Sequence, residues 1–177
     1  MKTTGTLWSI VLGALIGGIL LTASSAAQAQ FQTDEIPELS RDWTIRAGLF
    51  IFNSRAARDQ EGAVTFAGSV ERTVYTTPTY DVSIGVGYYG LGNVYSVPIM
   101  AHIIGHRESW RYGIGGGYAF GRRLDGRGSA GAAIGLLVGY QINRASRYPL
   151  NVDLRYNFIS GANNELDGYS ITLGVKF

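Results

Sequence analysis

The sequence contains no cysteine among its 177 residues. This absence excludes a disulfide framework and thiol chemistry. The chain also lacks a large net charge, because its 15 Lys and Arg residues exceed its 13 Asp and Glu residues by only two. No basic field is therefore available to bind nucleic acid. A third absence is that of a persistent 3.6-residue apolar stripe after Arg41, where a period of two recurs instead.

The N-terminal region has almost no charge. No charged residue lies between Lys2 and Asp34, and this interval contains an apolar stretch, Leu7–Leu21, and an Ala-x-Ala sequence that ends at Ala29. A basic start, an apolar middle and a small-residue exit are typical of a secretory signal peptide. An uncleaved anchor is the alternative, although anchors normally need about 20 apolar residues. We expect a signal peptide at 1–29, a periplasmic lead-in at 30–40 and one domain at 41–177.

Apolar and polar residues alternate strictly in the final segment, YSITLGVKF. Its odd positions from Tyr169 to Phe177 are all apolar or aromatic, and its even positions from Ser170 to Lys176, like Gly168 before them, are small or polar. Successive side chains of a strand point to opposite faces, so this pattern predicts a strand with one apolar face. The same pattern, interrupted at turn-rich stretches, predicts eight strands: 42–53, 62–75, 80–90, 94–105, 109–121, 129–143, 148–159 and 168–177.

The polar face of these strands carries few lysines or glutamates. A face exposed to water would be rich in both. It is rich in Gly, Ser, Thr and Ala, and the chain has 25 glycines in all. An eight-stranded cylinder has an interior just wide enough for side chains, so small residues there leave room for a few long ones. Buried charges must pair. The interior polar network that we predict is Arg46, Glu71, Asp81, Arg111, Asp153 and Arg155, in which three arginines can pair with three acids.

Aromatic residues gather near the predicted strand ends. One group would form a girdle at the inner membrane boundary: Trp43, Tyr80, Trp110, Tyr112, Tyr140 and Phe177. The other would form a girdle at the outer boundary: Phe66, Tyr88, Tyr95, Tyr118, Phe120, Tyr156, Phe158 and Tyr169. Aliphatic residues lie between them, which is the arrangement expected of a lipid-facing surface. The sequence therefore predicts an all-β, eight-stranded, antiparallel up-and-down transmembrane barrel with its apolar face toward lipid.

The final residues resemble the C-terminal assembly signal of bacterial outer-membrane barrels, with Tyr169, Ile171, Leu173, Val175 and Phe177 at every second position. Strand count, length and signal peptide together resemble the small eight-stranded superfamily of the OmpA and OmpX type. The resemblance covers 41–177 at the level of pattern and assigns no subfamily. It implies an outer-membrane location with both termini periplasmic, lipid and lipopolysaccharide as surroundings, the barrel assembly machinery as a partner in biogenesis, and a monomer with a structural or surface-interaction role.

Candidate catalytic residues are few. His102, His106 and Ser109, with Glu108 as an orienting acid, are the residues that could support hydrolysis. Outer-membrane lipid A deacylases carry a His and a Ser two residues apart by family resemblance, and no His-x-Ser occurs here. The two histidines would lie about 13 Å apart along a strand, too far to share a metal ion. We expect no enzyme activity, no metal and no cofactor, and a lipid-modifying enzyme is the alternative.

Three further features leave questions open. The loop that contains Arg122, Arg123 and Arg127 is the most basic, and we expect it to contact lipopolysaccharide phosphates. The interior ions could instead line a narrow passive channel, and a soluble lipocalin-like barrel would place the apolar face inward. Pro98 falls inside the fourth predicted strand, where it removes a ladder hydrogen bond; a bulge near the outer rim could absorb it, and the effect on the strand register stays open.

Overall fold

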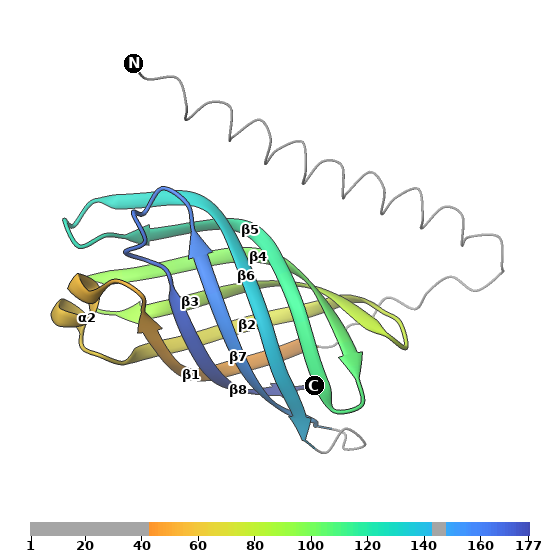
Figure 1. The fold of residues 1–177 in the computed structure, drawn as a ribbon. Coiled ribbons are helices and arrows are strands. Elements are labelled where there is room, and N and C mark those ends of the chain that lie inside the picture. Colours follow the sequence, from red (N-terminus) through yellow and green to blue (C-terminus); the bar gives the residue numbers. More distant parts are fainter. Residues whose placement is uncertain (1–42, 143–147) are drawn as a thin grey trace. The chain divides into compact units, whose positions relative to one another are not determined.

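Eight antiparallel strands form a closed barrel in sequence order, from β1 to β8 (Figure 1). The computed structural model describes residues 43–142 and 148–177. The strands are β1 (Trp43–Phe52), β2 (Thr65–Thr76), β3 (Tyr80–Leu91), β4 (Val94–Arg107), β5 (Trp110–Arg122), β6 (Gly128–Ile142), β7 (Leu150–Ile159) and β8 (Gly168–Lys176). The predicted fold class is confirmed, and the observed strands agree closely with the predicted ones. The predicted signal peptide and lead-in lie outside the described residues.

The barrel closes where β1 pairs with β8. Their register runs from Thr44 opposite Lys176 to Phe52 opposite Gly168. Beyond the ladder, the backbone amides and carbonyls of Trp43 and Phe177 exchange two hydrogen bonds of 2.8 Å. Every strand consequently has two neighbours, and the sheet has no edge whose backbone groups lack partners, as a bilayer requires.

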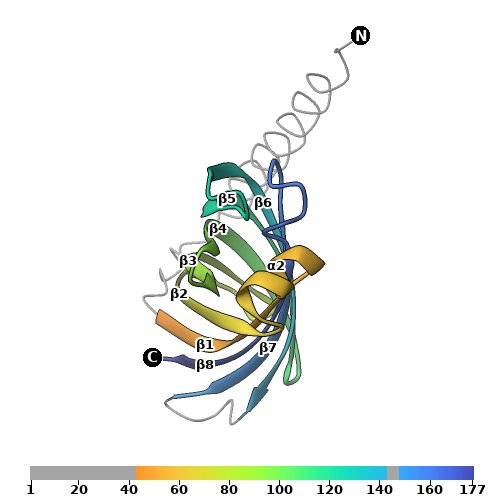
Figure 2. The ribbon, with the colours of Figure 1, turned by 90° about the vertical axis from the view of Figure 1, so that its left-hand side faces the viewer.

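The barrel has two ends that differ in their connections. We call the end at which β1 begins and β8 ends the terminal end; it carries the tight turns 77–79 and 108–109. The other end, which we call the loop end, carries the connections 53–64, 92–93, 123–127 and 160–167. Figure 2 looks onto the loop end.

The apolar face of every strand points away from the lumen. In β8, Ile171 is 54% exposed, whereas Asp153 on the inner face of the neighbouring β7 is 0% exposed. Exposed Ile, Leu and Val side chains recur on the outer face of all eight strands. A lipocalin-like barrel would place these side chains inside, so that alternative is wrong. The surface is instead the apolar belt of a barrel that crosses a lipid bilayer.

Aromatic side chains lie on this outer face near both ends. At the loop end, the rings of Tyr88 and Tyr95 stack with their centroids 5.7 Å apart, and Tyr156 lies 4.7 Å from Tyr169. At the terminal end, Trp110 meets Tyr140 edge to face at 5.5 Å. Amphipathic rings prefer the headgroup level of a membrane, so the two groups mark its two boundaries.

The connection after β1 contains a helix, α2 (Arg55–Glu61), which the sequence analysis did not predict. Its residues are mostly good helix formers, Ser54 caps its first turn by accepting from the Ala57 amide, and Ala57 is buried beneath it. Arg58 donates to the carbonyls of Phe52 and Asn53 and so ties the helix to the end of β1. Within the part of the chain that the structure describes, no helix is long and apolar enough to cross a membrane.

Pro98 does not shift the strand register, and no bulge forms at it. The β3–β4 register is the same on both sides of it, with Val86 opposite Ile99 and Tyr89 opposite Ser96, and no ladder pair forms in between. On the other side Pro98 pairs in register with Ala119 of β5. The missing amide therefore interrupts one ladder without shifting it. A register shift occurs elsewhere, between Thr73 and Tyr75 in the β2–β3 pair.

Candidate functional site

The lumen holds a cluster of buried ionic side chains that crosses it between β1–β2 and β5–β7. Arg46 of β1 contacts two carboxylates: its Nη1 lies 2.8 Å from Glu71 Oε2, and its Nε donates to Asp153 Oδ2 at 2.8 Å. Arg155 of β7 donates to Glu71 Oε1 and lies 3.7 Å from Asp153 Oδ2. Arg111 of β5 donates to Asp153 Oδ1 at 3.2 Å. We call these five residues the ion network.

Asp81, which the sequence grouped with these residues, lies apart from them. Its Oδ2 is 3.0 Å from His106 Nε2 and 3.6 Å from Lys176 Nζ, and its Oδ1 accepts from the Thr76 hydroxyl at 2.8 Å. The expected pairing of three arginines with three acids is therefore wrong: three arginines share two carboxylates. The third acid pairs with a histidine and a lysine that the count from sequence left out.

Glycines on neighbouring strands provide the space for these side chains. A Cβ built on Gly85 would collide with Glu71, and one on Gly139 would collide with the carboxylate of Asp153. The same holds at Gly174, where a Cβ would lie 2.8 Å from Arg46 Cγ. A real side chain at any of these positions would displace an ionic group. The high glycine content thus has the packing role that the alternation predicted.

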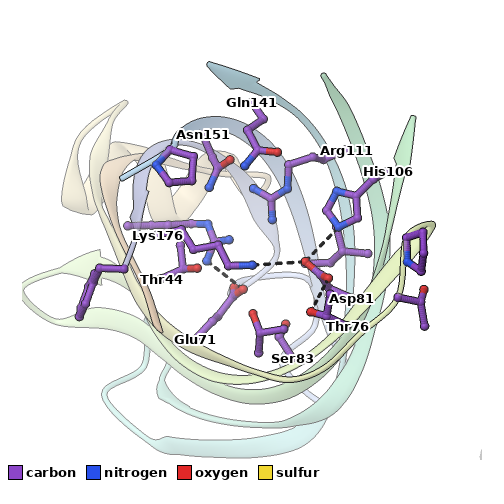
Figure 3. Close-up of a pocket in the computed structure, with 17 residues that line it drawn as sticks. Thr44, Glu71, Thr76, Asp81, Ser83, His106, Arg111, Gln141, Asn151 and Lys176 are labelled. Atoms are coloured by element: carbon purple, nitrogen blue, oxygen red, sulfur yellow. Dashed lines mark hydrogen bonds and ion pairs between the residues drawn. The ribbon is translucent and has the colours of Figure 1, made fainter. Parts of the chain in front are cut away.

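A cavity of about 330 Å³ occupies the terminal end of the lumen (Figure 3). The inner part of its wall is the ion network, including Arg46, Glu71 and Arg111, and the outer part includes Asp81, His106 and Lys176. The remaining lining residues carry hydroxyl or amide groups, at Thr44, Thr73, Thr76, Thr77, Ser83, Gln141 and Asn151, or are apolar, at Pro78, Ile104, Pro149 and Phe177.

The loop half of the lumen contains a cluster of apolar side chains, which the sequence analysis did not predict, beside buried polar side chains such as Thr65, Ser96 and Ser170. Phe50 packs against Phe52 with ring centroids 4.9 Å apart and against Tyr89 at 5.3 Å. Smaller side chains complete what we call the apolar cluster: Ala57, Ala67, Val94, Met100, Ala119, Ala133, Ile159, Ala162 and Leu166. The cluster includes residues of α2 and of the 160–167 loop, so these connections fold inward over the loop end. The signal for it is the run LFIF at 49–52, where apolar residues occupy both faces of β1.

The candidate hydrolytic residues are not assembled into a site. His102 is buried in the lumen opposite Gly115, where it fills the space that glycine leaves, whereas His106 lies at the terminal end beside Asp81. Ser109 lies in the turn before β5, and its carbonyl accepts from the Gln141 amide at 2.7 Å. No hydrogen bond or ion pair found among these described residues joins Ser109 to either histidine. Residues 43–142 and 148–177 also contain no group of three or more His, Asp or Glu side chains able to hold a metal ion.

The arginines of the 123–127 loop region have different surroundings. Arg123 makes two hydrogen bonds to the Glu165 carboxylate, at 2.9 and 3.2 Å, and these hold the pKa of Glu165 below its usual value. Arg122 is exposed and donates to the Gly126 carbonyl at 3.2 Å. Arg127 is exposed too, 3.9 Å from Asp125. Two of the three guanidinium groups predicted to contact phosphate therefore face solvent.

Hydrogen bonds join the connections of the loop end in pairs. The Glu61 carboxylate at the end of α2 accepts from the backbone amides of Asn93 and Val94 in the next connection. Glu165 joins its loop to the 123–127 loop, because it also accepts from the Leu124 amide. The loops are thereby held in place by contacts between them.

The residues of the predicted assembly signal all lie on the outer face of the barrel. Tyr169, Ile171, Leu173 and Val175 project from β8 and Phe177 follows it, all of them exposed. They are placed where a lipid or another protein can reach them.

Solved structures that share this fold include the following two. The crystal structure of Neisserial surface protein A aligns with a TM-score of 0.51 and 16% identity over 76% of this chain and 94% of that one. A de novo designed transmembrane β-barrel aligns with a TM-score of 0.51 and 12% identity over 80% of this chain and all of that one. No family model matches the sequence, and no curated protein sequence matches it. The predicted resemblance to small eight-stranded membrane barrels is confirmed at the level of the fold.

Proposed function

We propose that this protein is an integral barrel of the bacterial outer membrane, with a structural or surface-interaction role, no catalytic activity and a lumen that its own side chains close. The observation that carries the proposal is the outer face: an aliphatic belt on all eight strands between two groups of aromatic rings. Such a surface is stable in lipid and would aggregate in water. The proposed orientation has the terminal end in the periplasm and the loop end outside the cell.

The gel mobility of the protein, extracted from the membrane fraction and run with or without boiling, tests whether it forms a closed barrel in the membrane. A closed barrel stays compact in detergent until it is boiled, so unheated and boiled samples are expected to migrate differently. Co-fractionation with outer-membrane rather than inner-membrane markers is expected as well. Recovery of the folded protein from the soluble fraction would contradict the proposal.

We propose that the lumen is closed because two barriers to water and ions follow one another along it. The ion network links strands across the lumen at the terminal half, and the apolar cluster fills the loop half. Water and ions would have to break buried ion pairs and then pass between packed rings. Planar-bilayer recordings of the purified protein are expected to show no conductance steps, with a porin in the same bilayer as the positive control. Regular steps would favour the narrow channel instead.

Enzyme activity toward lipid A is the second candidate that a measurement should address. Among the residues that the structure describes, Ser109 and the two histidines occupy different surroundings and do not form a contacting pair of nucleophile and base. We expect the mass spectrum of lipid A from cells that express His102→Ala or Ser109→Ala to equal that from cells with the parent protein. A change in lipid A in these variants, with folding intact, would establish the enzyme.

Two partners belong to the same proposal. Lipopolysaccharide is expected at the loop end, where Arg122 continues the outer face of β5 beyond Phe120 and presents an exposed guanidinium. Arg122→Gln should reduce the lipopolysaccharide that co-purifies, and Arg72→Gln on β2 is the matched control because Arg72 stacks on Trp43 at the other end.

The barrel assembly machinery is expected to recognise the outward side chains of β8. Phe177→Ser should lower the fraction of assembled barrel more than Phe120→Ser, a change of the same kind outside the signal.

A further inference from the structure

The side chains that line the terminal cavity become less exposed with depth. Near its mouth, the side chains of Lys176, His106 and Asp81 are 22%, 13% and 12% exposed. Deeper in the wall, the side chain of Arg111 is 7% exposed, and that of its partner Asp153 is 0% exposed. Solvent therefore reaches the mouth of the cavity and is excluded where the ion network crosses the lumen.

The wall of the cavity begins at the terminal end of the barrel and is largely polar. Pro78, in the turn after β2, and Phe177, after β8, belong to this wall, and both residues are exposed. Figure 3 looks into the cavity and shows polar side chains directed into it from several strands, among them Gln141 and Asn151. Such a wall favours water over an acyl chain or another apolar occupant, because burying polar groups without hydrogen bonds is costly.

Two buried polar groups of the wall have no hydrogen-bond partner within the described part of the chain. They are the Ser83 hydroxyl on β3 and the side-chain oxygen of Asn151 on β7, and the two residues are 2% and 1% exposed. A buried polar group left unpaired costs about 1–3 kcal/mol, and buried water commonly supplies the missing hydrogen bonds. Because the two groups lie on different walls of the cavity, each needs a water molecule of its own.

We propose that the terminal half of the lumen is a water-filled vestibule, open at the terminal end and closed at the ion network. Its volume of about 330 Å³ holds about ten water molecules, at about 30 Å³ each. The column of water ends at the network, because the apolar cluster packs around Phe50 and Tyr89 beyond it. A channel would carry water through the whole lumen, whereas this vestibule has one opening.

Single cysteine substitutions measure how far water enters, and they are clean because the chain has no cysteine of its own. Ser83→Cys places a thiol in the vestibule. Ser96→Cys places one in the loop half, where Ser96 is 0% exposed and pairs with Tyr89. Asp125→Cys, in an exposed loop, is the positive control.

Each purified variant, folded in detergent micelles, is treated at alkaline pH with methyl methanethiosulfonate, a small neutral reagent. A maleimide that carries a polyethylene glycol chain is the bulky comparison. Alkaline pH keeps differences in thiol ionisation from dominating the rates. Mass spectrometry measures the rate of modification, and the unfolded variants give the total thiol. Since the protein is purified, the outcome does not depend on the membrane in which the barrel resides.

The small reagent is expected to modify Ser83→Cys at least about tenfold faster than Ser96→Cys, because a thiol sealed from water reacts only when the structure opens locally. The bulky maleimide should modify Asp125→Cys alone. If Ser83→Cys does not fold, Thr44→Cys, at a second position in the vestibule wall, decides. Equal rates in the vestibule and at Ser96→Cys would overturn the proposal: both slow would indicate a sealed terminal half, and both fast a lumen that is open throughout.

Discussion

Replacement of Asp153 by asparagine is the sharpest test of the ion network. Asp153 is completely buried, and its carboxylate lies 2.8 Å from Arg46 Nε, 3.2 Å from Arg111 Nη1 and 3.7 Å from Arg155 Nη2. Asparagine preserves the shape of the side chain and removes its charge. In Asp153→Asn, Arg46 and Arg155 would keep Glu71 as their one carboxylate partner and Arg111 would lose its carboxylate contact, while the amide NH₂ would add a further hydrogen-bond donor beside these guanidinium groups.

The cost follows from the burial of the partners. Removing one member of a buried ion pair costs about 3–5 kcal/mol, because the other charge is left without compensation. A Coulomb interaction at 4 Å with an effective dielectric constant of 20 is worth about 4 kcal/mol, which agrees with that range. We therefore expect the free energy of unfolding to fall by about 3–5 kcal/mol, with the barrel still folded in the absence of denaturant.

Urea unfolding in lipid vesicles, followed by tryptophan fluorescence, measures this loss through Trp43 and Trp110. Asp125→Asn is the matched control, since Asp125 lies in an exposed loop and its contact with Arg127 is 3.9 Å long. Adding Arg111→Gln to Asp153→Asn should recover part of the loss, because it removes one uncompensated cation. A loss below about 1 kcal/mol in Asp153→Asn, or a double variant whose effects simply add, would refute this account of the network.

Two other predictions concern the lumen and the loops. Gly139→Ala places a methyl group against the carboxylate beneath it and should cost about 1–3 kcal/mol, whereas Gly116→Ala, with nothing within 4 Å of its Cβ on the outer face, should be neutral or stabilising; urea unfolding compares them. In the loops, hydrogen bonding lowers the pKa of Glu165, so the contact stabilises the folded loop above the ordinary glutamate pKa and is lost as the pH falls through the lower folded value. The Leu124 amide, which donates to this carboxylate, should therefore titrate in NMR spectra with a midpoint below that of a free glutamate. Glu165→Gln should abolish this titration, and a midpoint at or above the ordinary glutamate value would contradict the assignment.

The positions of the strands and the side of each strand that faces lipid were predictable from the sequence, because the alternation of apolar and polar residues determines both. A strand that separates lipid from a narrow lumen must alternate, and the alternation in β6 and β8 shows in the residues themselves. The interior glycines follow from the same constraint, since a cylinder of eight strands has room for an ionic side chain only where its neighbour has none. Gly139 beside Asp153 and Gly174 beside Arg46 are instances.

The sequence did not predict which inward-facing side chains meet, because this depends on their positions along the barrel axis. Asp81 and the ion network both lie on the inner face of the strands, but this face runs the full length of the barrel. Asp81 contacts His106 and Lys176 near the terminal end, and the order of residues along the strands does not show this. The helix α2 was missed because its apolar contact is one small residue, Ala57, which gives no amphipathic stripe. The alternation does not predict the apolar cluster, because Phe50 and Phe52 occupy inward-facing positions and the alternation predicts a polar interior.

The ion network and the apolar cluster lie in different halves of the lumen, and their placement follows from what lies beyond each end. The apolar cluster includes Ala57 of α2 and Ala162 and Leu166 of the 160–167 loop, so the loops contribute side chains to the packing of the lumen beneath them. A change in the position of these loops must therefore disturb the rings of Phe50 and Phe52. The ion network, by contrast, joins strand to strand, and no loop residue belongs to it. Stiffness of the barrel wall and placement of the outer loops are thus supplied by separate sets of contacts, so substitutions in the loops can alter the surface without weakening the ion pairs below.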